Sequence, residues 1–518
     1  MGYDVRLISK IIDMKKVAFV LLAFFANVLF VHAQTYQVNL SATLTKDYEM
    51  FKKGEKIKIE ALEHEVKEDN GNLVDLFHIS INGQKCPIKN NIQDRMNFEY
   101  KTVQDLWDAQ VISNVLKTIT KKGPQNQMRN EMENDALEYI SKVKGYNMEL
   151  QDPFLENYIY SLLAKIAPVD VIDGRPGNVN ILLMNDPETN AAMYPNGTLI
   201  INSGLLSCLN TEDELVAILA HEVAHFILDH SVQNVNKILL RKKRAEFWSA
   251  VATGVAAVAE GVAASRNRYY TPGAVTLGVA ALSSAIASEV IEHLGMKYNH
   301  EQEYEADEMA VEVLKILRYD PNALATALHK LQAVQVKDRV HSMYFQSYTH
   351  PALIERIQKA GVPQDKHDVN FERMISFTVT STARMKFEDR RFRQVLPLVS
   401  QNIQNRVGSS EDYILKANCM MSLYNTAESN AEILQLVADA KKLEPSNINI
   451  YKTEILAYLR TKEYQKAVAL IEEYMAKLKQ MRASLQEIED DKTWDNSNQF
   501  ILEEIAWSEK MKVKVQNL

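Results

Sequence analysis

Two hydrophobic periodicities divide the chain. Residues 34–105 alternate apolar and polar positions, most clearly in "EKIKIEALE", and the pair Asn82-Gly83 lies between two extended runs, as in a β-hairpin. Later segments instead repeat apolar residues every three or four positions. In "DPFLENYIYSLLAKIAP" one predicted helix face carries Leu155, Ile159, Leu162, Leu163 and Ile166. The pattern therefore predicts a small antiparallel β domain before a largely helical remainder.

These changes of pattern predict a multidomain, mainly α-helical protein. The β domain spans residues 34–105, and a polar, helical linker spans residues 106–149. Residues 150–365 combine helices with short strands, which predicts an α+β domain, and residues 366–518 have the pattern of helical hairpins.

The C-terminal hairpins resemble tetratricopeptide repeats. Aromatic and small residues have the spacing of that repeat in residues 449–478, namely Tyr451, Ile455, Tyr458, Tyr464 and Ala467. Weaker units cover residues 413–445 and 383–398. The alternative is a generic helical bundle in which the aromatic residues only fill the core. Stacked repeats would create a concave surface for protein partners.

The N-terminus has the features of a secretory signal. Residues 14–33 begin with Met14 and two lysines, continue with an apolar run and end in Val31-His32-Ala33, as before a cleavage site. We expect cleavage before Gln34 and export. The alternative is an uncleaved membrane anchor, although the apolar run is short for a transmembrane helix.

Composition excludes two other classes. The 518 residues carry a formal net charge of −8 with scattered lysines and arginines, which argues against nucleic-acid binding. The three cysteines, Cys86, Cys208 and Cys419, are odd in number and widely spaced, so they do not form a disulfide framework. Folding must therefore depend on packed cores.

The segment "ILAHEVAHFILDH", residues 218–230, predicts a metal site on a helix. His221 and His225 stand one turn apart on the same face, so their imidazoles can bind one zinc ion, while Glu222 can address a water on that ion. The alternative is a core helix with buried histidines. His230 is offset from the ligand face and is expected to be structural.

A second acidic segment supplies the third ligand through a family resemblance. Residues 298–314, "YNHEQEYEADEMAVEVL", would by themselves be a solvated acidic helix face. Together with the first motif they resemble the HtpX and CAAX-prenyl-protease group of gluzincin metallopeptidases, in which HExxH is followed by E-x-x-A-D. The resemblance implies that Glu303, rather than Glu301 or Glu305, is the third zinc ligand, and that Asp307 supports a ligating imidazole.

The resemblance covers about residues 150–365. Residues 183–206 are similar to the family's strand pair, whose exposed edge accepts an extended peptide, and Pro195-Asn196-Gly197 forms the predicted turn. "SYTHPALIERI", residues 347–357, resembles the element H-P-x-x-x-x-R.

The last element gives two further candidate catalytic residues, His350 and Arg356. His350 is expected to donate to the oxyanion, to bind the metal as an inhibitory latch, or only to cap a helix. Arg356 is expected to be a fixed charge near the zinc carboxylates or the developing negative charge, or to lie on a solvated face.

The family resemblance implies a zinc endopeptidase with one zinc per chain and Glu222 as general base. With the export signal and the repeats, it predicts a periplasmic enzyme of a Gram-negative bacterium that cleaves unfolded or misassembled proteins. The repeats would contact envelope assembly machinery and leave the chemistry alone. The alternative is a chaperone or scaffold with a latent or structural zinc site, but structural sites usually have four ligands, often cysteines, and no cysteine lies near either motif.

Two apolar stretches separate the zinc motifs, at residues 245–265 and 272–295. They are rich in alanine, glycine and serine, and Glu260 interrupts the first. We expect a buried helical pair; transmembrane spans and contact with a membrane surface are the alternatives.

Overall fold

The structure, a computed structural model, describes nine stretches of the chain: residues 34–49, 51–81, 84–111, 124–144, 149–167, 179–235, 293–337, 353–485 and 491–517. The predicted signal peptide, His350 and nearly all of the two apolar stretches lie outside them. No helix within these residues is long and apolar enough to cross a membrane. The chain separates into two compact units, Met1–Ser113 and Asn114–Leu518.

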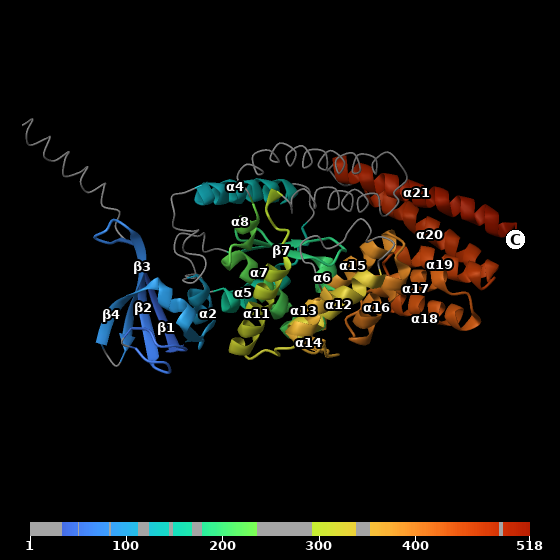
Figure 1. Cartoon of the computed structure of the whole chain (residues 1–518). Coiled ribbons are helices and arrows are strands. Elements are labelled where there is room, and N and C mark those ends of the chain that lie inside the picture. Colours follow the sequence, from blue (N-terminus) through green and yellow to red (C-terminus); the bar gives the residue numbers. More distant parts are fainter. Residues whose placement is uncertain are drawn as a thin grey trace, which may run out of the picture. The chain divides into compact units, whose positions relative to one another are not determined.

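The first unit is an antiparallel sheet with one helix. Its strands are arranged in the order β4-β3-β2-β1-β5, and helix α2 contacts β1 (Figure 1). Leu40, Ile59 and Phe77 are buried in its core, and Trp107 of α2 is buried as well. The predicted small β domain is confirmed. The elements are β1 (Gln34–Leu44), β2 (Lys56–Lys67), β3 (Leu73–Ile81), β4 (Gln84–Lys89), the 3-10 helix η1 (Asn90–Arg95), β5 (Met96–Glu99) and α2 (Val103–Gln110).

The second unit begins with an α+β region. In its three-stranded sheet β8 is central, parallel to β6 and antiparallel to β7. The predicted turn before β8 is present, and Gly197 has a φ of 81°, which a residue without a Cβ adopts at little cost. The elements are α4 (Pro124–Lys144), α5 (Pro153–Ile166), β6 (Asn180–Met184), β7 (Ala191–Met193), β8 (Thr198–Asn202), α6 (Ser203–Leu206), α7 (Glu212–Ile227), α8 (His230–Asn234), α11 (His300–Leu317), α12 (Ala323–Lys337) and α13 (Leu353–Ala360).

Helix α7 is the centre of this region. Nearly all of its residues are buried, because α5, α11, α12 and β7 pack around it. A helix that is apolar on every face needs such an environment. At its N-terminus the Thr211 side chain accepts a hydrogen bond from Glu214 N–H, and Glu212 accepts one from the Tyr319 hydroxyl at 2.7 Å. These contacts hold α7, and with it the histidine motif, in place.

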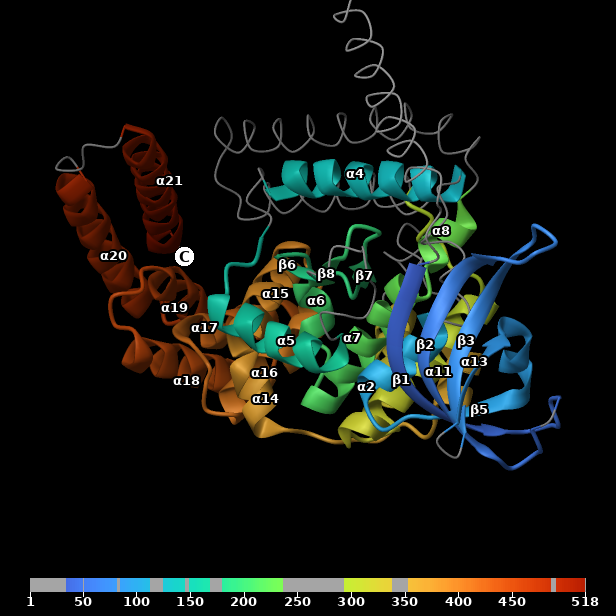
Figure 2. The ribbon, with the colours of Figure 1, turned by 90° about the vertical axis from the view of Figure 1, so that its left-hand side faces the viewer.

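The C-terminal part is helical, as predicted. Successive helices pack side by side in chain order (Figures 1 and 2). In the α19–α20 pair, Tyr451, Ile455 and Ala467 are buried, and the Tyr451 ring stacks on Tyr474 with 5.4 Å between centroids. Their identity as tetratricopeptide repeats stays a prediction. The helices are α14 (Val369–Met374), α15 (Ser376–Glu388), α16 (Phe392–Gln404), α17 (Ser410–Leu423), α18 (Ala427–Leu443), α19 (Asn449–Arg460), α20 (Tyr464–Leu485) and α21 (Asp491–Gln516).

Candidate active site

Helices α7 and α11 bring His221, His225 and Glu303 together. One ligand atom of each lies within 4.8 Å of the others, and all three side chains are buried. The two histidine Nε2 atoms are 3.0 Å apart, and the Glu303 carboxylate oxygens lie 3.7 Å from His221 Nε2 and 3.6 Å from His225 Nε2. The capping box of Asn299 and Gln302 begins α11 just before Glu303, where the helix dipole favours a carboxylate.

This donor set fits a zinc ion. Two imidazole nitrogens point at each other across a short distance, and one carboxylate lies against both. Two histidines and one glutamate are the protein ligands of one class of catalytic zinc sites, in which a fourth position stays open. The burial of the three side chains requires a partner for their charge and lone pairs.

Asp307 and Arg356 form a buried charge network behind His221. Asp307 Oδ1 lies 2.9 Å from His221 Nδ1, and Arg356 donates to both Asp307 oxygens at 2.7 Å. Arg356 Nη1 also contacts Glu303. Burial raises the pKa of the Asp307 carboxyl, but His221 and Arg356 outweigh this effect and lower it to about 2. Burial opposes the charge of Arg356, yet Asp307 and Glu303 raise its pKa. The network stays charged at neutral pH.

A second set of contacts surrounds His225. Its Nδ1 lies 2.8 Å from His230 Nδ1, and His230 Nε2 lies 3.3 Å from a Glu305 oxygen. The His225 ring also stacks on Tyr298, with 3.7 Å between centroids. Sequence reasoning gave His230 no part in the site and considered Glu305 only as a rejected ligand. In a continuous helix, His230 would be rotated by roughly 140° from His225.

The structure explains this difference through one backbone conformation. Helix α7 ends at Ile227, and Asp229 adopts the left-handed region with φ 66°. The chain therefore changes direction, and α8 begins with His230 beside His225. A sequence signal for such a reversal is weak, because aspartate is only one of the residues that tolerate a positive φ.

Glu222 connects the histidine motif to the edge of the sheet. Tyr194 N–H donates to the Thr198 carbonyl, and Asn202 N–H donates to the Asn190 carbonyl. Between these two hydrogen bonds, successive residues of β7 therefore point their backbone groups alternately toward β8 and away from it. Ala191 and Met193 therefore direct their backbone groups away from β8. Met193 N–H donates to Glu222 Oε2 at 3.1 Å. The motif glutamate thus lies against the edge of β7 that points away from β8.

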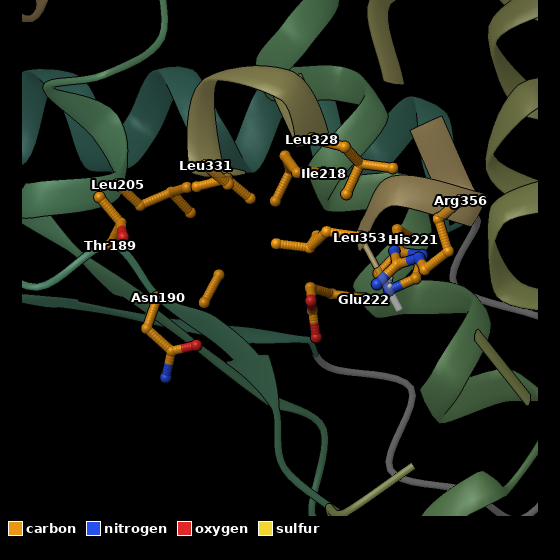
Figure 3. A pocket seen from close by; sticks show the side chains of 11 residues that line it. Thr189, Asn190, Leu205, Ile218, His221, Glu222, Leu328, Leu331, Leu353 and Arg356 are labelled. Atoms are coloured by element: carbon orange, nitrogen blue, oxygen red, sulfur yellow. Dashed lines mark hydrogen bonds between the residues drawn. The ribbon is translucent and has the colours of Figure 1, made fainter. Parts of the chain in front are cut away.

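A pocket of about 460 Å³, including its open mouth, begins at His221, Glu222 and Arg356 (Figure 3). Its far wall is apolar and comes from four helices, whereas the segment leading into β7 forms another side. The remaining lining residues are Thr189, Asn190, Ala191, Leu205, Ile218, Leu328, Leu331 and Leu353. An apolar group would fit this surface.

The comparison with protein families agrees with this geometry. Residues 154–362 match the family model described as Peptidase family M48. This part of the chain is an M48 peptidase domain. The M48 domain lies within residues 150–365, the range of the sequence resemblance, and it contains every described candidate residue: His221, Glu222, His225, Glu303, Asp307 and Arg356. M48 peptidases depend on a metal.

Relatives of the M48 domain include two proteases of Escherichia coli. The chain is 28% identical over 194 residues to the beta-barrel assembly-enhancing protease of Escherichia coli, covering 37% of this chain and 36% of that protein. It is 28% identical over 188 residues to the metalloprotease LoiP of the same organism, covering 36% of this chain and 62% of LoiP. The match thus spans about a third of the beta-barrel assembly-enhancing protease and somewhat under two thirds of LoiP.

A solved structure, yeast Tom70, aligns over 80% of both chains at 12% identity. Its TM-score is 0.22, which is too low to support a statement about the fold.

Proposed function

We propose that this chain is a zinc endopeptidase of the bacterial envelope. The observation that carries the proposal is the convergence of His221, His225 and Glu303 beside Glu222 at the mouth of a pocket. The M48 domain supports a metal-dependent peptidase. Zinc, with one ion per chain, is the metal that this donor set fits best.

Glu222 is the proposed general base. A zinc ion held by the three ligands would polarise the scissile carbonyl and lower the pKa of a water in its open position. Glu222 takes the proton of the attacking water and returns it to the leaving amine. Its position between the ligand histidines and Met193 gives it access to both the reacting bond and the edge of β7.

The substrate is proposed to bind as an added strand on β7. The backbone groups of Ala191 and Met193 that point away from β8 can pair with an extended peptide. Because Glu222 accepts from Met193 N–H, a peptide carbonyl at that position would displace the glutamate toward the reacting bond. Only an extended segment can pair in this way, which favours unfolded substrates.

Arg356 is proposed to position the ligands. Its guanidinium contacts Glu303 and both oxygens of Asp307, and these contacts support the alternative of a fixed charge near the zinc carboxylates. It also lines the pocket and is 1% exposed. For His350 the three alternatives of the sequence stay open, because it lies outside the described residues.

The biological role is proposed to be quality control in the periplasm of a Gram-negative bacterium, after removal of residues 14–33. The name of the beta-barrel assembly-enhancing protease of Escherichia coli supports a link to envelope assembly, which the C-terminal helices would provide. The rival proposal is a scaffold or chaperone whose zinc site is latent. The pocket beside Glu222 favours catalysis, since a purely structural site needs no such opening.

The test compares the wild type with Glu222→Gln on an unfolded protein substrate, with zinc measured in both. We expect both proteins to bind one zinc and the variant to lose several powers of ten in kcat. A wild-type protein that binds zinc but does not cleave would favour the scaffold, whereas equal cleavage by both proteins would exclude Glu222 as the base.

A further inference from the structure

We propose that His230 and Glu305 are positioning residues that hold the ligand His225 in one tautomer and one ring orientation. The inference rests on the proposed metal site and concerns a pair of residues outside the three ligands. His230 and Glu305 come from α8 and α11, so the pair also connects α8 to the helix that carries Glu303.

The directions of the hydrogen bonds follow from the position of His225. Its Nε2 faces His221 and Glu303 and must be unprotonated to bind a metal, so its Nδ1 carries the proton. The His225 Nδ1–H then donates to His230 Nδ1 over 2.8 Å. His230 in turn carries its proton on Nε2 and donates to the Glu305 carboxylate over 3.3 Å. Each nitrogen of the two rings thus has one defined role in this series of hydrogen bonds.

The arrangement around His221 is similar to that around His225, but it lacks the intervening histidine. His221 Nδ1 lies 2.9 Å from the Asp307 carboxylate, which Arg356 holds. Around His225 an imidazole is inserted between ligand and carboxylate. Each ligand histidine is thus linked on its outer nitrogen to an acidic residue of α11, directly or through His230.

The surroundings fix the His230 ring. His230 is fully buried, and its backbone carbonyl accepts from the Gln302 side chain at 3.4 Å. Tyr298 stacks on His225, and its hydroxyl is 3.1 Å from Ser231 Oγ. Packing alone could orient the two rings, but it would not determine which nitrogen carries the proton. The Glu305 carboxylate determines the position of the proton, because it can only accept a hydrogen bond and therefore requires N–H at His230 Nε2.

The test measures metal binding rather than turnover. Glu305→Ala removes the carboxylate that ends this series of hydrogen bonds. The Glu305 side chain is 42% exposed, so folding should be retained. Glu301→Ala removes an exposed glutamate from the same helix and is the matched control. His230→Phe keeps an aromatic ring of similar shape and removes both nitrogens. The zinc dissociation constant is measured by competition with a chelator, and the site geometry by the visible absorption spectrum of bound cobalt(II).

We expect Glu305→Ala and His230→Phe to weaken zinc binding by roughly 10- to 100-fold and to change the cobalt spectrum, while Glu301→Ala has no effect. A Glu305→Ala protein that binds zinc as tightly as the control, with the same cobalt spectrum, overturns the inference even if His230→Phe fails to fold. Absence of zinc binding by the wild type would instead contradict the proposed function.

Discussion

The two flanks of the M48 domain differ in how they are attached. The N-terminal sheet forms a compact unit by itself, within Met1–Ser113, whereas the C-terminal helices share a unit with the M48 domain. The Ser381 hydroxyl donates to the Asn185 side chain at 2.8 Å, and α15 packs on α6. Hydrophobic periodicity marks both flanks as separate segments, but it contains no information about which one is bound to the catalytic core.

The C-terminal contacts lie close to the proposed substrate strand. Residues 185–190 lead into β7, and Thr189 and Asn190 line the pocket. Arg391, which is almost completely buried, donates to Glu188 in this segment at 2.8 Å. The helices after residue 366 therefore contact the segment that leads into β7. These contacts are the reason for testing the expectation that the helices leave the chemistry alone.

The largest effect is expected from removing one flank. A protein that ends at Lys366 lacks the helices that contact residues 185–190, and its helix α6 is exposed where α15 packs in the full chain. Cleavage of a short peptide should therefore fall more than tenfold. A protein lacking residues 34–111 should cleave the same peptide at the wild-type rate. Peptide cleavage and zinc content are measured for both truncated proteins. Full activity of the protein ending at Lys366 would mean that the C-terminal contacts do not support the active site.

A smaller effect is expected from a single contact of the C-terminal flank. Arg391→Ala should lower kcat/KM on an unfolded substrate about five- to tenfold, because the segment leading into β7 loses a charged partner, whereas zinc affinity stays unchanged. Arg384→Ala is the control, since Arg384 pairs with Glu411 within the C-terminal helices and is half exposed. If the two variants have the same kcat/KM, the contact with Glu188 has no role in substrate binding.

The smallest effect concerns the stability of the N-terminal unit. Burial raises the pKa of Asp108 from 3.8 to about 6. The folded state holds this proton more tightly than the unfolded state, so the unit loses stability as pH rises from about 4 to 6. The loss is at most ~3 kcal/mol and is reduced by solvent screening. Hydrogen exchange of α2 should be slower in Asp108→Asn than in the wild type at pH 7.

The same comparison at pH 4 should give nearly equal exchange, because Asp108 is protonated in the folded state there. Asp69→Asn, at an exposed turn, serves as the control. The activity of the M48 domain should not follow this pH dependence, since α2 belongs to the other unit. An Asp108→Asn effect on peptide cleavage would indicate that the two units are coupled.

The sequence alone determined those features that depend on neighbours along the chain. His221 and His225 lie on one face because they are one helical turn apart, and the turn at Gly197 follows from the residues that tolerate its conformation. The small β domain and the helical C-terminal part follow from periods of two and of three to four residues. Glu303 and Asp307 needed a family resemblance in addition, because they lie on another helix.

Only the tertiary structure decided which distant residues meet. His230 reaches His225 because Asp229 reverses the chain, Met193 meets Glu222 because β7 lies at the sheet edge, and Arg391 meets Glu188 across about two hundred residues. Each contact depends on a turn angle or on the packing of whole elements. Local periodicity describes which side of a helix or strand is apolar, and it cannot specify which partner that side or its polar neighbours will contact.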